Sequence, residues 1–264
     1  MDVKMSFKTV EIILPAGEAP EIIRLEDGRY KVVQMVEEVI EEVVNETKSF
    51  DNDFILIEAE KLSMKDTFMK YEPKTDRGKE AKALISAVIE KKVKNFYRPK
   101  CDPSFTEDGE GICFVSGKRP AVGKSYDWWH DVAKKYNPER NSRLGTKLQY
   151  GAFLGVLIKN LVEEGKNLEW AWNAVCNDSR ELGHYWNSEN AKHDFEPTGS
   201  RMICGFYDLA NTYKILAEDE EAGGFWLAGG NYRKYGNNNP LADICHNCNR
   251  NNISDVSVGW IVLD

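Results

Sequence analysis

The sequence lacks long apolar runs and has few cysteines. No stretch approaches the ~18 apolar residues that a membrane-spanning helix requires, so we expect no membrane insertion. Residues 1–15 lack a long apolar segment followed by small residues, so no signal peptide is expected. Six cysteines among 264 residues are too sparse for a disulfide scaffold. Reduced thiols and synthesis in a bacterial-type cytoplasm are therefore expected.

An excess of basic residues is also missing. The chain has 35 Lys and Arg against 43 Asp and Glu, which gives a net charge of −8 and a pI near 5.3. Nucleic-acid binding depends on a basic face that neutralises phosphates. Nucleic acid is therefore not an expected partner, and we interpret the basic run at 90–100 as a solvated helix end.

What is present is typical of a globular protein, with 42% hydrophobic and 11% aromatic residues. Apolar spacing in the first hundred residues predicts a small α+β module of alternating strands and helices. A connector at 98–111 carries Pro and Gly and interrupts this pattern, so we place a domain boundary at 110/111. The expected elements are strands at 6–15 and 53–62, a hairpin at 21–33 around Asp27-Gly28, and helices at 30–46 and 76–98.

The second part, 111–264, differs in composition because it holds all seven tryptophans and all four histidines. Two helices are expected, at 146–166 with Thr146 as N-cap and at 167–183 with Asn167 as N-cap. Short strands with long loops follow, at 202–210, 223–230 and 256–264. The predicted fold class is α+β with small antiparallel sheets. Its core is expected to include Phe225, Trp226, Leu227 and Trp260.

The segment between the last two strands is the least ordinary part of the chain. Residues 231–252 hold eight Asn, whereas the preceding 230 residues hold twelve. A zinc site, a low-complexity tail and a binding surface are three interpretations. Zinc would use Cys245 and Cys248, but a structural zinc needs four ligands and no second such pair exists. We expect no metal and no cofactor.

Four short motifs of the second part occur in an order that resembles a known family. They are SRLGTKLQYGAF at 142–153, GFYDLANTYKIL at 205–216, GGFWLAGGNY at 223–232 and SVGW at 257–260. Together they resemble the formylglycine-generating-enzyme branch of the C-type lectin fold over roughly 122–264. This resemblance implies a C-type lectin-like fold for 111–264 and does not cover the first hundred residues.

Within that branch, the chain is most similar to the variable proteins of diversity-generating retroelements. These are receptors of phages and bacteria whose C-terminal segment is rewritten by reverse transcription with errors at template adenines. The resemblance implies a hypervariable surface at about 231–255 that binds a protein or another cell-surface ligand. It also implies that the chain can be incorporated into a phage virion.

Codon chemistry is consistent with this interpretation. The residues that Asn codons reach when they change only at adenines include Asn, Tyr, Asp, His, Ser, Thr, Ile, Cys, Gly, Arg and Phe, whereas Lys, Glu, Gln, Met and Trp cannot be reached. Lys234 is outside this set, and we interpret Pro240 to Asp243 as constant scaffold. The candidate variable, ligand-binding residues are Asn231, Tyr232, Arg233, Tyr235, Gly236, Asn237, Asn238, Asn239, Ile244, Cys245, His246, Asn247, Cys248, Asn249, Arg250, Asn251, Asn252 and Ile253.

Two other functions stay open at this point. The same branch includes formylglycine-generating oxidases, which use a cysteine pair near the C-terminal end of the fold, and Cys245 and Cys248 lie there. The family pattern for copper-dependent catalysis is not evident, so we expect a binding protein with no catalytic residues. An invariant structural virion protein is the other alternative. Residues 1–110 have no recognisable chemistry, and oligomerisation or docking to a larger particle is the role considered for them.

Overall fold

The computed structural model describes residues 53–182, 197–199, 202–219, 224–229, 240–247, 249 and 256–264, with the backbone of two further strands. Contacts divide the chain into one unit at Met1–Phe50 and a second at Asp51–Asp264. In the first unit, β1 (Glu21–Arg24) and β2 (Tyr30–Val33) pair antiparallel, with Arg24 opposite Tyr30. The hairpin around Asp27-Gly28 is therefore confirmed. The expected strand at 6–15 and residues 34–46 of the expected helix lie outside the described residues.

The second unit mixes helices with short strands, so the α+β fold class is confirmed. Its helices are α2 (Asp76–Glu90), α3 (Tyr126–Tyr136), α4 (Lys147–Glu163) and α5 (Leu168–Cys176), with 3-10 turns η1 (Ala59–Lys61), η2 (Thr67–Lys70), η3 (Pro138–Arg140) and η4 (Ser179–Glu181). Its strands are β3 (Phe54–Ile57), β4 (Phe96–Pro99), β5 (Ser104–Phe105), β6 (Ile112–Cys113), β7 (Arg143–Leu144), β8 (Met202–Ile203), β9 (Phe206–Tyr207), β10 (Tyr213–Asp219), β11 (Gly224–Ala228), β12 (Ile244–Asn247), β13 (Ser257–Gly259) and β14 (Ile261–Val262).

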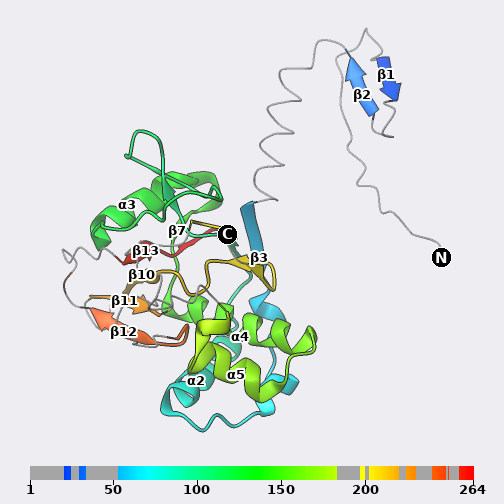
Figure 1. The fold of residues 1–264 in the computed structure, drawn as a ribbon, viewed down its shortest axis with the longest axis vertical. Coiled ribbons are helices and arrows are strands. Elements are labelled where there is room, and N and C mark those ends of the chain that lie inside the picture. The colour runs from blue at the N-terminus through cyan, green and yellow to red at the C-terminus, as the bar shows by residue number, and fades with distance from the viewer. Residues whose placement is uncertain are drawn as a thin grey trace, which may run out of the picture. The chain divides into compact units, whose positions relative to one another are not determined.

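Four strands form the largest sheet, in the order β12-β11-β10-β13. The β10–β11 and β11–β12 pairs are antiparallel, and β13 joins β10 in parallel. Figure 1 shows α3 on one side of this sheet and α4, with α2 and α5, on the other. On the α3 side, a Cβ on Gly259 would lie 2.4 Å from Trp129 Cε3, so only glycine permits this close packing.

The C-terminal strand ties the ends of the second unit together. β14 pairs antiparallel with β7, and the next residue, Leu263, bridges to Tyr97 of β4. Tyr97 N donates to Leu263 O at 2.8 Å, and Leu263 N donates to Tyr97 O at 3.0 Å. Residues far apart in the sequence are therefore held at one place in the fold.

The core crosses the boundary that the sequence predicted at 110/111. Ile57, Ile85 and Phe96 lie in the same buried cluster as Phe153 and Trp260. The expected connector at 98–111 also carries structure, because β5 pairs with β6 across it. The division in the structure lies between Phe50 and Asp51, so residues 53–110 belong to the second unit. Pro and Gly marked a turn-rich passage within one unit rather than a linker.

The helices α4 and α5 begin where their N-cap residues predict. Thr146 forms a capping box with Gln149 at the start of α4, and Asn167 caps α5. The expected helix at 76–98 was too long: α2 ends at Glu90, Lys92 has φ +51°, and β4 follows. The sequence analysis also missed α3, which Ser125 caps through its side chain.

The expected core residues divide into two groups. Phe225 and Trp260 are buried, with 2% and 3% of their surface exposed, as predicted. Trp226 and Leu227 are only half-buried, so that part of the prediction was wrong. Among the described residues, no helix combines the length and apolar character needed to cross a bilayer.

Candidate functional site

The tetrapeptide Pro240 to Asp243, which separates the two Asn-rich stretches, is anchored in the second unit. Leu241 and Ala242 are buried. Leu241 N donates to Ser179 Oγ at 3.0 Å, and Leu241 O accepts from Tyr150 Oη at 3.0 Å. Ala242 N donates to Val175 O at 3.1 Å. Three elements of the second unit, α4, α5 and η4, therefore hold this short segment through its backbone.

The described residues on either side of the first Asn-rich stretch, Gly229 and Pro240, lie next to each other. A Cβ on Gly229 would be 2.2 Å from Pro240 O and 2.9 Å from Asp243 Cβ, so this contact requires glycine. Asp243 also pairs with Arg77 of α2 at 3.4 Å. Gly229, directly after β11, therefore lies beside Pro240 and Asp243.

The second Asn-rich stretch begins on β12, which pairs antiparallel with β11. Leu227 lies opposite Cys245, and Ala228 lies opposite Ile244. Because side chains alternate across a strand, Cys245 and Asn247 share one face and Ile244 and His246 share the other.

Burial follows this alternation in part. Cys245 is exposed, while Ile244 is half-buried and packs against the core. His246 and Asn247 are half-buried, and Asn249 is exposed. We expected Cys245, His246 and Asn247 to share one exposed face. This does not hold along β12, because His246 is half-buried and lies with Ile244 on the face opposite to Cys245.

His246, a candidate residue, forms an aromatic pair with Trp226, which the sequence analysis placed in the core and not at the site. Their rings meet edge-to-face, with centroids 5.0 Å apart. Lys147 Nζ, at the first position of α4, lies 3.6 Å from the centroid of the Trp226 ring. Lys147 thus makes a cation–π contact with Trp226, and Trp226 in turn contacts the candidate residue His246. We therefore regard Trp226 as a neighbour of the candidate surface.

The other candidate residues lie outside the described part of the chain. They are Asn231, Tyr232, Arg233, Tyr235, Gly236, Asn237, Asn238, Asn239, Cys248, Arg250, Asn251, Asn252 and Ile253.

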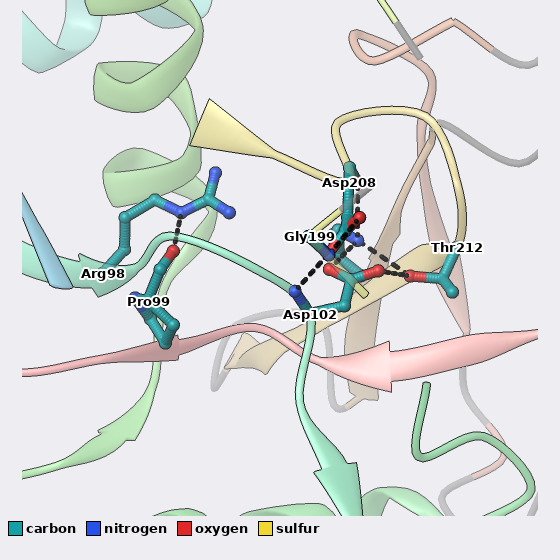
Figure 2. A network of polar contacts seen from close by, with 7 residues as sticks. Arg98, Pro99, Asp102, Gly199, Asp208 and Thr212 are labelled. Carbon is teal, nitrogen blue, oxygen red and sulfur yellow. Dashed lines mark hydrogen bonds and ion pairs between the residues drawn. The ribbon is translucent and has the colours of Figure 1, made fainter. Parts of the chain in front are cut away.

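A second group of charged and polar side chains is buried inside the second unit, and Figure 2 shows most of this group. Asp102, Thr212 and Lys214 form a closed triangle of hydrogen bonds. Thr212 Oγ1 donates to Asp102 Oδ2 at 2.7 Å and accepts from Lys214 Nζ at 2.7 Å. Lys214 Nζ donates to the other carboxylate oxygen, Oδ1 of Asp102. The side chains of Lys214 and Asp102 are 4% and 3% exposed.

Asp208 joins this triangle to two backbone segments. Its carboxylate accepts from Asp102 N at 2.9 Å and from Gly199 N at 2.9 and 3.0 Å (Figure 2). Asp208 itself has φ +56°, a left-handed conformation that Asp tolerates better than most residues. The segment after β4 and residue 199 therefore meet at one carboxylate.

Burial sets the protonation behaviour of this cluster. Together with the negative charge of Asp102, it raises the pKa of Asp208 to about 6. Burial also lowers the pKa of Lys214 and of Arg98, although Asp102 opposes both shifts. Arg98 lies over the rings of Phe153 and Phe206, at 4.7 and 5.2 Å from their centroids. The negative charge of Asp102 thus offsets part of the cost of burying the positive charges of Lys214 and Arg98.

Three of the described cysteines are thiols whose pKa burial raises strongly. Burial raises the pKa of the thiols of Cys101, Cys176 and Cys204 to about 12, which keeps them protonated at neutral pH. All five described cysteines are free thiols. Within the described ranges, no group of three or more His, Cys, Asp or Glu could hold a metal ion.

The sequence analysis did not single out the enclosed cluster. Asp208 lies in the GFYDLANTYKIL motif, and Asp102 precedes a proline in the expected connector. Each looks like an ordinary turn residue, because no periodicity links positions 102, 208 and 214. Only a buried contact across more than a hundred residues brings them together.

Comparisons with known proteins give no match: no family model, no curated protein and no solved structure matches this chain.

Proposed function

We propose that this chain is a ligand-binding receptor whose recognition surface is formed by the two stretches at 231–239 and 244–253. We further propose that the chain is a C-type lectin-like variable protein of a diversity-generating retroelement. Its ligand is a protein or another molecule on a cell surface. The observation that carries this proposal is the constant tetrapeptide at 240–243, which is anchored in the unit while the residues on both sides have the adenine-variable composition.

Leu241 and Ala242 differ from Cys245 and Asn249 in both burial and composition, which supports the proposal. Leu241 and Ala242 are buried and belong to the Asn-free tetrapeptide that we interpret as constant scaffold. Cys245 and Asn249 are exposed and fit the pattern. Random substitution is tolerated only where it does not disturb packing, because core changes cost a large part of a marginal stability. A surface that varies therefore needs fixed segments of this kind between its variable parts.

The residue types also suit recognition. Tyr provides a large contact area at low entropic cost, and Asn, Ser and Gly adapt their hydrogen bonding. Tyr232 and Tyr235 stand among five Asn and Gly positions of the first stretch. Arg and aromatic residues dominate the energy of many interfaces, so we expect Tyr232, Arg233 and Tyr235 to contribute most to binding.

Two matched libraries test the proposal. The first draws residues from the Asn-codon set at 231–233, 235, 237–239, 245 and 247; the second draws them at Leu241 and Ala242. We expect most members of the first library to remain folded, with melting temperatures within a few degrees of the parent, and to differ in binding to bacterial cells. Most members of the second library should unfold. If the first library unfolds as often as the second, or if all its members bind alike, the receptor proposal fails.

The DNA beside the gene provides an independent test. The retroelement part of the proposal requires a near-copy of the 3′ end of the gene that differs at adenines, next to a reverse transcriptase. Finding neither would leave a fixed-specificity receptor or a structural virion protein, which the binding library distinguishes.

A further inference from the structure

The enclosed triangle of Asp102, Thr212 and Lys214 has the geometry of an amide-forming site. Lys214 Nζ and the Asp102 carboxyl group are in direct contact, and both side chains are almost entirely shielded from water. Thr212, which is 0% exposed, connects the amine to the second carboxyl oxygen through two hydrogen bonds of 2.7 Å. The backbone oxygen of Asp208 also accepts from Lys214 Nζ, at 3.5 Å. The amine is thus held by three acceptors, one of which is a carboxyl oxygen of Asp102.

We propose that Lys214 and Asp102 condense to an isopeptide bond, an intramolecular cross-link between β10 and the segment that follows β4. The proposal does not depend on the receptor function.

Burial favours the uncharged forms of Lys214 and Asp102, an amine and a carboxylic acid. Charged groups lose their hydration when buried, and burial lowers the pKa of the Lys214 ammonium. A proton can therefore pass from the ammonium to Oδ2 of Asp102, through the Thr212 hydroxyl, to give an amine and a carboxylic acid. Thr212 is oriented for this transfer because it accepts from Lys214 and donates to Asp102.

The condensation then balances without a further reactant. The Nζ lone pair attacks Cγ of Asp102, which forms the C–N bond and places negative charge on Oδ1. Arg98 favours this charge electrostatically. A second proton moves from Nζ through Thr212 to the hydroxyl at Oδ2, the C–Oδ2 bond breaks, and one water leaves. The products are the amide and water, with no change in oxidation state.

The cross-link would close a loop of large sequence separation, since positions 102 and 214 differ by 112. Closing such a loop restricts the unfolded chain and so stabilises the folded state. The cross-link would fix the start of β10. This strand pairs with β11, which in turn pairs with β12.

Mass spectrometry of the full chain, reduced and denatured, tests the proposal. We expect an intact mass lower than the calculated mass by one water. Trypsin should yield peptide 101–118 joined to peptide 202–233, because a modified Lys214 resists cleavage. Unmodified peptides 101–118, 202–214 and 215–233 would overturn the proposal. So would a loss of water in an unlinked peptide, since Asp108-Gly109 within 101–118 can dehydrate to a succinimide on its own.

Variants distinguish the roles of the three residues. Lys214→Met should have its full calculated mass, whereas Lys82→Met, which removes a lysine that pairs with the exposed Glu72, should still lose one water. Thr212→Val preserves the shape of the side chain but removes its hydroxyl, so the linked fraction should decrease. Complete linkage in Thr212→Val would contradict the proton transfer through Thr212. If Lys214→Met does not fold, the peptide map of the unaltered chain still decides the question.

Discussion

Trp260 and Trp226 are close in the fold but differ in how much of their surface is covered. Trp260 is 3% exposed and contacts the rings of Phe96, Tyr150 and Phe153. Trp226 is half-buried under Lys147. Trp260→Ala should therefore lower the free energy of unfolding by about 3–5 kcal/mol. Trp226→Ala should cost less than half as much. Urea unfolding of both variants checks this order, and equal losses would contradict the burial difference.

Asp208 should make stability depend on pH in an unusual direction. Its pKa is raised to about 6 in the folded protein, whereas an unfolded Asp has a pKa of about 4. The folded state then binds the extra proton between these values, so this residue's contribution is present at low pH and is lost as pH rises through about 6.

The variant Asp208→Asn removes this titration and leaves the other carboxyl groups in place. We expect the destabilisation caused by the substitution to be largest near pH 4 and to decrease by about 2 kcal/mol by pH 7, from the shift of roughly two pKa units. Urea midpoints of both proteins across this range provide the measurement. A destabilisation that grows with pH would show that Asp208 is ionised in the folded protein throughout.

At the level of elements, β12 combines candidate variable residues with a packing role. Ile244 contacts the core, and its neighbour Cys245 is exposed on the opposite face. Asn is the residue from which both are reached in the codon argument. Ile244→Asn should destabilise the protein by about 1–3 kcal/mol because it places a polar amide against apolar neighbours. Cys245→Asn should change stability by no more than about 0.5 kcal/mol.

Thermal unfolding and cell binding of these two variants can be compared directly, since each serves as the control for the other. Similar stability would mean that β12 does not present alternate faces to the core. A change of binding in Cys245→Asn without loss of stability would assign that position to the recognition surface.

At the level of the whole molecule, the division lies between Phe50 and Asp51. A chain that starts at residue 51 should therefore retain cooperative unfolding. A chain that starts at residue 111 should not fold, because it lacks Ile57, Ile85 and Phe96 of the shared core. It also lacks β4, which pairs with Leu263. Calorimetry or near-UV circular dichroism of the two fragments measures this. A folded 111–264 fragment would restore the boundary that the sequence suggested.

Helix starts were determined by local residues, so the sequence was sufficient to predict them. Thr146 and Asn167 satisfy free N–H groups within their own first turn, and Gly165 has φ +88° where α4 ends. The same locality explains the hairpin around Asp27-Gly28. α3 was missed because its polar residues hide the apolar stripe of Tyr126, Trp129, Val132 and Ala133.

The composition of 231–252 was likewise evident from the sequence, and it was the basis for interpreting Pro240 to Asp243 as constant scaffold. What holds that tetrapeptide was not evident, because its partners Tyr150, Val175 and Ser179 come from distant segments. The extent of the second unit and the triangle of Asp102, Thr212 and Lys214 were decided only by the tertiary structure. Local patterns record propensity and exposure, whereas a shared core and a buried charge pair depend on which distant residues the chain brings into contact.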